Sequence, residues 1–247
     1  MASAAEVPVS TGLVDKREAR IRKMFGAIAP SYDLLNHLLS LNVDRYWRWR
    51  TTRLAPPPCD GPILDVCTGT GDLALDYDRA AGGRVRIVGA DFCHEMLVRA
   101  EAKSRSQAPG RIHYVEADAQ RLPFPDDQFQ ITTVAFGLRN VTDTDRGLTE
   151  MVRVTRPGGR VAILEFSRPR HWLFGRLYRF YFRRVLPCVG QLVSRSRDRA
   201  YHYLPASVQE FPDGEALAER LRGHGLRDVR WRPFTFGIAT LYIGVKA

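Results

Sequence analysis

From Gly61 to the C-terminus, short apolar runs alternate with segments whose apolar residues recur at helical spacing. The runs have the length of buried strands and lie at 62–66, 84–91, 111–118, 129–136 and 159–166. The helical segments lie at 71–81, 93–105, 145–155 and 214–225. This alternation is typical of a parallel sheet with helices on both faces. Two further strands, 226–234 and 236–247, are expected to form an antiparallel hairpin at the sheet edge.

The chain before Gly61 follows a different pattern. Residues 15–54 have helical spacing, and Ser31 is the expected N-cap of a helix within them. The proline-rich stretch that follows, "APPPCDG", breaks this pattern. We therefore expect a disordered tail, an N-terminal helical cap and a main domain, at 1–14, 15–58 and 59–247.

A helical insert is expected at 168–212, between the last parallel strand and the next helix. Its core, 173–186, is amphipathic at 100° per residue, with an aromatic side and a side that carries Arg176, Arg179 and Arg183. Such a helix can lie at a membrane interface, where anionic lipids attract its arginines. It can equally pack its apolar side on the domain and leave the arginines in solvent. Both readings hold if the helix covers a channel for an apolar tail.

The chain is basic, with 37 Lys and Arg against 27 Asp and Glu, a formal charge of +10. Most of the excess falls at 168–199, where nine arginines accompany one aspartate. This balance indicates a negatively charged partner: nucleic acid, an anionic membrane surface or an acidic substrate. We expect no secretory signal in the first residues, and no apolar run comes near the roughly 18 residues of a membrane span. The four cysteines form no CxxC pair, which fits a cytoplasmic protein without a zinc or disulfide framework.

The first strand leads into a glycine turn, "ILDVCTGTGDLAL". Gly69, Gly71 and Ala74 let a ligand approach the backbone, and the next helix offers free N–H groups to an anion. The spacing Gly-x-Gly-x-x-Ala also fits a dinucleotide site. Asp91, at the end of the next strand, is placed to bind ribose hydroxyls in either case. The turn by itself therefore leaves NAD and S-adenosylmethionine (SAM) both open.

Two further acids distinguish these cofactors. Asp65 lies inside the first strand, where it can order the turn and reach a cationic amine such as that of SAM. Asp118 ends the third strand, next to Ala119, and can accept from the exocyclic amine of adenine. With Asp91, an acid thus follows each of three successive strands. This pattern resembles the class I SAM-dependent methyltransferases, which implies a Rossmann-like, mostly parallel seven-stranded sheet with helices on both faces and an antiparallel edge hairpin.

The chain further resembles one group of these enzymes over roughly residues 20 to 245, the ubiquinone/menaquinone biosynthesis C-methyltransferases, and in particular the demethylmenaquinone methyltransferases. The segments that carry the resemblance are "FGAIAPSYDLLNHLLSLNVDRYW", "LDVCTGTGDLAL", "VEADAQRLPFPDDQF", "AFGLRNVTD", "RVTRPGGRVAILEFS" and "AYHYLPASV". The run Phe-Gly-Leu-Arg-Asn is the most specific of them. The chain departs from the family pattern at Asp44, usually His, at Leu35, usually Met, and at Ala135, often Ser.

The resemblance implies SAM-dependent C-methylation of the ring of a polyprenylated quinol, with S-adenosyl-L-methionine as the methyl donor and no metal. The residues expected at the cofactor are Asp65, Gly69, Thr70, Gly71, Asp91, Asp118, Ala119 and Ala135. Arg139 and Asn140 are expected to face the quinol. Because a guanidinium is a poor base, we interpret Arg139 as a fixed positive charge beside the ring oxygen, and Asn140 as an orienting group. The proton acceptor stays open among water, Tyr32, Asp33, His37, Tyr201 and His202.

Several alternatives remain at this point. A naphthoquinol and a benzoquinol substrate are not distinguished, although we favour demethylmenaquinol in menaquinone biosynthesis. A small-molecule methyltransferase of another pathway, a non-catalytic SAM sensor at a membrane surface and an NAD oxidoreductase are less favoured. A nucleic-acid methyltransferase is disfavoured because the loop after the fourth strand, "AFGLRN", lacks the Asn/Asp-Pro-Pro-aromatic element. We expect a cytoplasmic enzyme that can be peripheral on the inner face of the cell membrane; a homodimer stays open.

Overall fold

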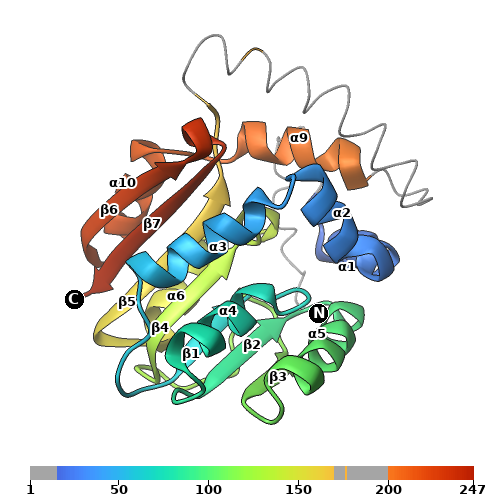
Figure 1. The fold of residues 1–247 in the computed structure, drawn as a ribbon. Coiled ribbons are helices and arrows are strands. Elements are labelled where there is room, and N and C mark those ends of the chain that lie inside the picture. Colours follow the sequence, from blue (N-terminus) through green and yellow to red (C-terminus); the bar gives the residue numbers. More distant parts are fainter. Residues whose placement is uncertain (1–15, 170–175, 177–199) are drawn as a thin grey trace, which may run out of the picture.

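A seven-stranded sheet in the order β3-β2-β1-β4-β5-β7-β6 forms the centre of the part of the chain that the structure describes (Figure 1). The structure is a computed structural model and describes residues 16–169, 176 and 200–247. The strands are β1 Ile63–Val66, β2 Ile87–Asp91, β3 Ile112–Glu116, β4 Phe129–Ala135, β5 Thr155–Phe166, β6 Leu226–Phe234 and β7 Ala239–Lys246. Each overlaps a strand predicted from the apolar runs.

The strand directions confirm the predicted class I fold. β1 to β5 run parallel, and β7 enters antiparallel between β5 and β6. In the register, Val66 of β1 lies between Ala90 of β2 and Val134 of β4. The carboxyl ends of these three strands therefore meet at one edge of the sheet. Ligands of open α/β sheets bind outside this edge, at the point where the strand order reverses.

Helices cover both faces of the sheet because successive strand residues point to opposite sides. Leu64 and Val88 belong to a core with α6 and α10, whereas Ile63 and Ile87 belong to a core with α4. Trp47 of α3 packs in a further cluster over β5 and β7. The helices are α1 Glu18–Ile28, α2 Tyr32–Leu39, α3 Val43–Leu54, α4 Asp72–Ala81, α5 His94–Gln107, α6 Thr144–Val154, α9 Ala200–Glu210 and α10 Glu215–Gly223.

The helices α1, α5 and α9 meet above the carboxyl edge of the sheet (Figure 1). Ile21 and Met24 of α1 pack with Met96 of α5 and with Tyr203 and Val208 of α9. Short 3-10 turns connect several elements: η1 Ala29–Ser31, η2 Leu138–Asn140 and η4 Thr235–Gly237. Because α1 and α9 are about 170 residues apart in the sequence, this cluster joins distant segments of the chain at the ligand edge.

Some sequence expectations need correction or stay predictions. Ser31 stands at the start of α2, but its hydroxyl donates to the Ile28 carbonyl at 3.4 Å and makes no N-cap hydrogen bond. The tail 1–14 and the amphipathic helix 173–186 lie outside the described residues, apart from residue 176. The division at residue 58 into cap and main domain stays a prediction. None of the described helices combines the length and apolar character needed to span a bilayer.

Candidate active site

A pocket opens where β1, β2 and β4 end, under α1 and the start of α2. Its empty space is about 670 Å³, which includes space open to solvent at its mouth. Seven residues predicted from the sequence line it: Tyr32, Gly69, Asp91, Asp118, Ala119, Ala135 and Asn140. Asp33, Asp65, Thr70, Gly71 and Arg139, also predicted, lie outside its lining.

The glycine turn after β1 is sharp because three of its residues have positive φ: Cys67, Gly69 and Gly71. A Cβ built on Gly69 would meet no atom within 4 Å, so its pocket side is open. A Cβ on Gly71 would lie 2.5 Å from the Tyr114 hydroxyl, so this glycine is needed for packing against β3. The two glycines therefore have different roles, one toward the pocket and one toward the core.

Two buried carboxylates hold the turn. The Thr68 hydroxyl donates to Asp65 Oδ2 at 2.6 Å, which ties the turn back to β1. Asp91 accepts from the backbone N–H of Gly69 at 2.8 Å and of Cys93 at 2.9 Å. Burial raises the pKa of Asp65 to about 7, with the Thr68 hydrogen bond opposing it. Burial also raises the pKa of Asp91 to about 6, although the two N–H donors stabilise its charged form.

The far wall of the pocket comes from the loop after β3 and from the segment after β4. Asp118 accepts from the Gln120 backbone N–H at 2.9 Å and from its side-chain amide at 3.1 Å. Gln120 Oε1 in turn accepts from the Asp143 N–H at 2.9 Å. Phe136 has a positive φ of 57° and lines the pocket between Ala135 and Asn140. These hydrogen bonds hold the loop after β3 in place. Ala135 contributes only backbone atoms and a methyl group to the pocket.

Arg139 is buried in an ion pair behind this wall. Its guanidinium donates to Glu165 Oε1 at 2.8 Å and to the Phe136 carbonyl, and it lies over the Phe166 ring. The two charged side chains are 7% and 1% exposed. Its Nε–H, also buried, has no hydrogen-bond partner among the described residues. The Nε–H is therefore an unused donor, although Arg139 itself does not line the pocket.

Asn140 and Tyr32 bring polar atoms to the apolar side of the pocket. Asn140 Oδ1 is buried and has no hydrogen-bond partner among the described residues. Tyr32 stacks edge-on against Phe25, with ring centroids 6.1 Å apart. Burial raises the pKa of Tyr32, so its phenol stays protonated and can donate. An unsatisfied buried acceptor is costly in an empty site, and it is satisfied if a ligand hydroxyl donates to it.

Asp33 and Thr70 meet each other rather than the pocket. The Thr70 hydroxyl donates to Asp33 Oδ1 at 2.5 Å, and Lys103 Nζ lies 2.6 Å from Asp33 Oδ2. The same Lys103 ammonium contacts Asp72 at 2.7 Å. These bonds join α2, the glycine turn, α4 and α5. We call Asp33, Thr70, Lys103 and Asp72 the latch, because they tie the first turn of α2 to the cofactor turn.

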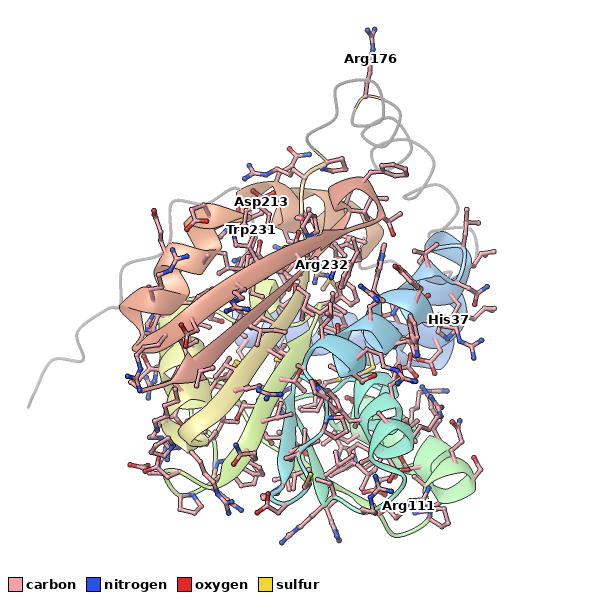
Figure 2. The ribbon with its side chains drawn as sticks, turned by 60° about the vertical axis from the view of Figure 1, so that its left-hand side comes forward. His37, Arg111, Arg176, Asp213, Trp231 and Arg232 are labelled. Carbon is pink, nitrogen blue, oxygen red and sulfur yellow. The ribbon has the colours of Figure 1, made fainter. Side chains whose placement is uncertain are left out.

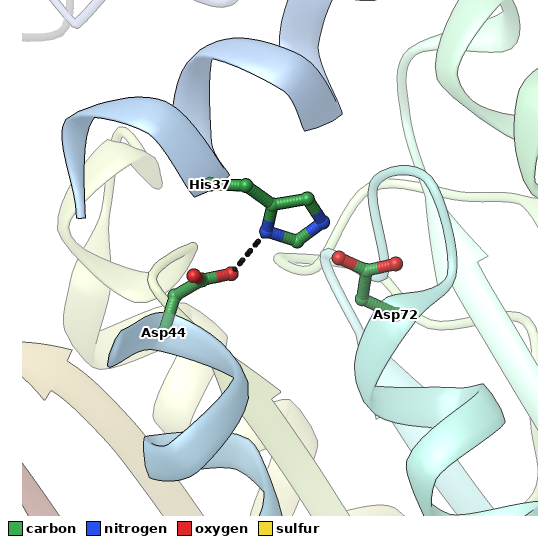
Figure 3. Close-up of side chains that lie close together, drawn as sticks. All are labelled: His37, Asp44 and Asp72. Atoms are coloured by element: carbon green, nitrogen blue, oxygen red, sulfur yellow. Dashed lines mark hydrogen bonds and ion pairs between the residues drawn. The ribbon is translucent and has the colours of Figure 1, made fainter. Parts of the chain in front are cut away.

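The His37, Asp44 and Asp72 side chains lie close enough to share a cation, as Figure 3 shows. His37 Nδ1 lies 2.8 Å from Asp44 Oδ2. The Arg48 guanidinium, however, donates to Asp44 at 2.8 Å and lies 3.1 Å from Asp72. An arginine therefore already neutralises both carboxylates, and the cluster is an ion-pair network between α3 and α4 rather than a metal site. Arg48 is its centre, and Asp44, which departs from the family pattern, is its closest carboxylate.

His202 and Tyr201 belong to α9, but their side chains lie outside what the structure describes. Their neighbour Tyr203 is described. Burial raises its pKa to about 12, and its hydroxyl has no hydrogen-bond partner among the described residues. His37 faces Asp44 and is not part of the pocket lining.

Sequence reasoning missed two charged residues of this region, Glu165 and Lys103. Glu165 could have been found from the sequence, because it is an acid near the end of the apolar run 159–166. Asp65 and Asp91 occupy similar positions in the runs of β1 and β2. Lys103 could not have been found in this way. It is one of several basic residues on α5, and only the fold brings it to Asp33, seventy positions earlier.

The fold and the pocket together define a class I SAM-dependent methyltransferase. A solved structure from Thermotoga maritima, a SAM-dependent methyltransferase described as a possible histamine N-methyltransferase, superposes with a TM-score of 0.65 at 16% identity. The alignment covers 92% of this chain and 100% of that chain. At this identity the likeness shows the fold alone, since one fold hosts many activities.

The family follows from sequence. The model of the ubiE/COQ5 methyltransferase family matches residues 13–246, and the chain belongs to this family. The ubiquinone/menaquinone biosynthesis C-methyltransferase UbiE of Geobacter sulfurreducens is 50% identical over 235 residues, 95% of this chain and 91% of that protein. The demethylmenaquinone methyltransferase of Deinococcus radiodurans is 47% identical over 232 residues, 94% of each. The predicted family and enzyme class are therefore confirmed, with SAM as the cofactor.

Proposed function

We propose that this enzyme methylates a ring carbon of polyprenylated demethylmenaquinol. One observation carries the proposal. A single pocket joins the acid-ended strands, with Asp91 and Asp118, to an aromatic wall made by Phe25, Tyr32 and Phe136. A charged, ribose-bearing cofactor fits the first part and an apolar ring fits the second. The similarity to the demethylmenaquinone methyltransferase of Deinococcus radiodurans supports the naphthoquinol over a benzoquinol.

The residues at the cofactor end fit SAM. Each oxygen of Asp91 accepts one backbone N–H and keeps a lone pair for a ribose hydroxyl. Gly69 leaves its pocket side open, and Asp118 is an acceptor at the third strand for an adenine amine. Asp65 holds the turn through Thr68. When bound, SAM supplies an electrophilic methyl on a sulfonium.

The residues at the quinol end hold and polarise the ring. Asn140 Oδ1 accepts from a ring hydroxyl, and the neutral Tyr32 phenol donates to a ring oxygen. Arg139 lies behind the pocket wall in an ion pair with Glu165, so its positive charge favours the developing oxyanion only from a distance. A ring carbon is nucleophilic only when a neighbouring hydroxyl loses its proton, so the reduced quinol is the substrate.

The contacts of Asp33 and Tyr32 reduce the number of candidates for the proton acceptor. Asp33 has one oxygen occupied by Thr70 and the other by Lys103, so it acts in the latch rather than as a base. Tyr32, whose pKa is raised, is a donor. His37 faces Asp44 outside the pocket lining. Water, Tyr201 and His202 are left, and we assign the proton to water, with His202 as the side-chain alternative. We place the enzyme peripherally on the inner face of the cell membrane, where a polyprenyl tail resides.

An assay with labelled SAM and short-tail acceptors tests the function. We expect label in the reduced demethylated naphthoquinol, none in the oxidised quinone, and a much lower kcat/KM for the matching benzoquinol. Asn140→Leu should raise the KM for quinol while the Kd for SAM stays unchanged, and Asp91→Asn should do the reverse. Equal kcat/KM for both ring systems would overturn the naphthoquinol assignment. An absence of transfer to every reduced quinol would overturn the function.

A further inference from the structure

Apolar side chains gather on the outer side of α2 and α3. Leu34 and Leu38 of α2 and Leu41 just after it lie four and three positions apart, which places them on one side of the helix. They are 62%, 47% and 79% exposed. Tyr46 and Trp49 of α3 are about half exposed. We call these five residues, together with Arg45, Arg50 and Arg53, the α2–α3 surface. Figure 2 shows α2, marked by His37, next to α3 at one side of the molecule.

Leu41 is held outward against its backbone preference. It has a φ of 53°, in the left-handed region that is unfavourable for a residue with a branched side chain. The next residue, Asn42, shares this conformation but suits it, because Asn tolerates positive φ. A solvated turn has no need of a leucine here, since Gly or Asn would fit without strain. The sequence thus keeps an apolar side chain exposed at a backbone position that disfavours it.

The part of the surface on α3 alternates aromatic and basic side chains. The Tyr46 and Trp49 rings lie 6.1 Å apart. The guanidinium groups of Arg53 and Arg50 lie over the Trp49 ring, 5.7 and 6.0 Å from its centroid. Aromatic residues with an apolar body and a polar edge, flanked by arginines, are typical of the boundary between lipid headgroups and acyl chains.

The positive charge of the α2–α3 surface favours an anionic partner. Residues 34–55 contain one acid, Asp44, which is buried against Arg48. Among the described residues, no acidic side chain forms an ion pair with Arg45, Arg50 or Arg53. A two-fold interface centred on this surface would bring the arginines of two copies together with no exposed acid of residues 34–55 to pair them. An anionic lipid surface instead meets both the arginines and the leucines.

The surface adjoins the pocket through α2. This helix begins with Tyr32, which lines the pocket, and continues with Leu34 and Leu38, which face outward. We propose that the α2–α3 surface docks on an anionic lipid bilayer, with the leucines and Trp49 inserted and the arginines at the headgroups. The inference rests on the proposed function in one respect, that a polyprenylated quinol reaches the pocket from the bilayer. It does not depend on residues 173–186.

Flotation with vesicles tests the proposal in the full chain. The probes are vesicles of phosphatidylcholine alone and with about one third phosphatidylglycerol. We expect binding to the anionic vesicles only. Arg45→Gln with Arg53→Gln should weaken it about 25-fold, at about fivefold for each arginine. Leu34→Gln, Leu38→Gln and Leu41→Asn together should weaken it at least tenfold. The matched controls on α5, Arg99→Gln with Arg105→Gln, and separately Val98→Gln, should float like the wild type.

Two further measurements separate the outcomes. All variants should methylate a short-tail naphthoquinol in solution like the wild type, while the α2–α3 variants should lose activity on a long-tail quinol in vesicles. Flotation equal to the wild type for both α2–α3 variants would overturn the docking surface. A fall in molecular mass in sedimentation velocity, with flotation unchanged, would assign the surface to a second copy instead. If the wild type transfers no methyl group to the short-tail quinol, the proposed function is refuted. The flotation results would then still decide whether the α2–α3 surface binds the bilayer.

Discussion

Asp91 is the residue whose charge controls the cofactor end of the pocket. Its carboxylate is buried at the end of β2, and burial raises its pKa to about 6 although two backbone N–H groups donate to it. The group is therefore part protonated near pH 6. A protonated carboxyl has fewer lone pairs for ribose hydroxyls. The binding of SAM should thus depend on pH in the range where Asp91 titrates.

We expect the affinity for SAM to increase about tenfold between pH 5 and pH 7, because the ionised fraction of Asp91 rises over that range. Calorimetric titration at several pH values measures it. Asp91→Asn should bind weakly and with a flatter profile. Asp65, whose pKa is about 7, contributes to the same window, so Asp65→Asn serves as the comparison. If the pH dependence of SAM affinity is the same in Asp91→Asn as in the wild type, the group that titrates is Asp65 and not Asp91.

The Arg139–Glu165 pair is the second residue-scale feature with a measurable energy. Both side chains are buried, so removal of either leaves an unpaired charge in the protein interior. Arg139→Ala and Glu165→Ala should each lower the free energy of unfolding by about 3–5 kcal/mol. The double variant should lose clearly less than their sum. Urea denaturation measures all three, and additive losses would show that the pair is not coupled.

The exposed pair Arg105–Glu101, 3.6 Å apart on α5, is the matched control for this comparison of the two single variants with the double variant. Its coupling should stay below about 0.5 kcal/mol, because solvent screens exposed ion pairs. Methyl transfer by Arg139→Lys adds a second test. Lysine keeps the charge but lacks the planar fork with which Arg139 bonds Glu165 and the Phe136 carbonyl. We expect kcat to fall while the Kd for SAM stays constant.

At the scale of elements, the ion-pair network around Arg48 joins α3 to α4. Burial works to raise the pKa of Asp44, but Arg48, the Ser40 hydroxyl and His37 outweigh it and hold this pKa below its usual value. A carboxyl with a lowered pKa stabilises the fold above its unfolded pKa. That contribution is lost as the pH falls through the folded pKa.

Asp44→His introduces the residue that the family usually has at this position. We expect it to lower the free energy of unfolding at pH 7 by about 3 kcal/mol, because Arg48 loses its closest carboxylate. The loss should shrink as the pH falls below about 4, the pKa of an unfolded Asp, because the charged Asp44 carboxylate stabilises the fold less at lower pH. Urea denaturation at pH 7 and pH 3 measures it. An equal loss at both pH values would show that packing, not charge, is responsible.

The latch is the second link between elements, and it ties α2 to the cofactor turn. Lys103→Met removes the cation that Asp33 and Asp72 share. We expect the Kd for SAM to increase about three- to tenfold, because the turn that carries Gly69 loses support from α2. Isothermal titration measures it. The control is Lys23→Met, an exposed lysine of α1 outside the latch. A Kd equal to that of the control would show that the latch does not position the turn.

The elements themselves were largely predictable, and the links between them were not. The strands follow from apolar runs such as 62–66 and 159–166, whose length and composition depend only on local sequence. Asp91 and Asp118 could be named because strand ends converge at one edge in any parallel sheet. The latch could not, since Asp33 and Lys103 meet only through tertiary packing. For the same reason, no local pattern indicates that the Thr70 hydroxyl bonds Asp33 instead of lining the pocket.

For the whole molecule, the pocket lies at the junction of parts that are far apart in the sequence. α1 and α2 cover it, β1, β2 and β4 end in it, and α9 packs against α1 above it. A ligand that fills this pocket therefore bridges the N-terminal helices and the sheet. Binding should stabilise all of these parts together, and not the glycine turn alone.

SAM at 100-fold excess over its Kd should raise the free energy of unfolding by about 2.7 kcal/mol. For a chain of this length, that corresponds to an increase in Tm of roughly 5–10 °C. Amide exchange should slow in α1 and α2, residues 18–39, as well as at 67–71 and 117–120, because Ile21, Phe25 and Tyr32 close the pocket from above. The β6–β7 hairpin, which does not line the pocket, should change only with global stability. Asp91→Asn at the same SAM concentration is the control. Protection confined to 67–71 and 117–120 would show that α1 and α2 do not close over the cofactor.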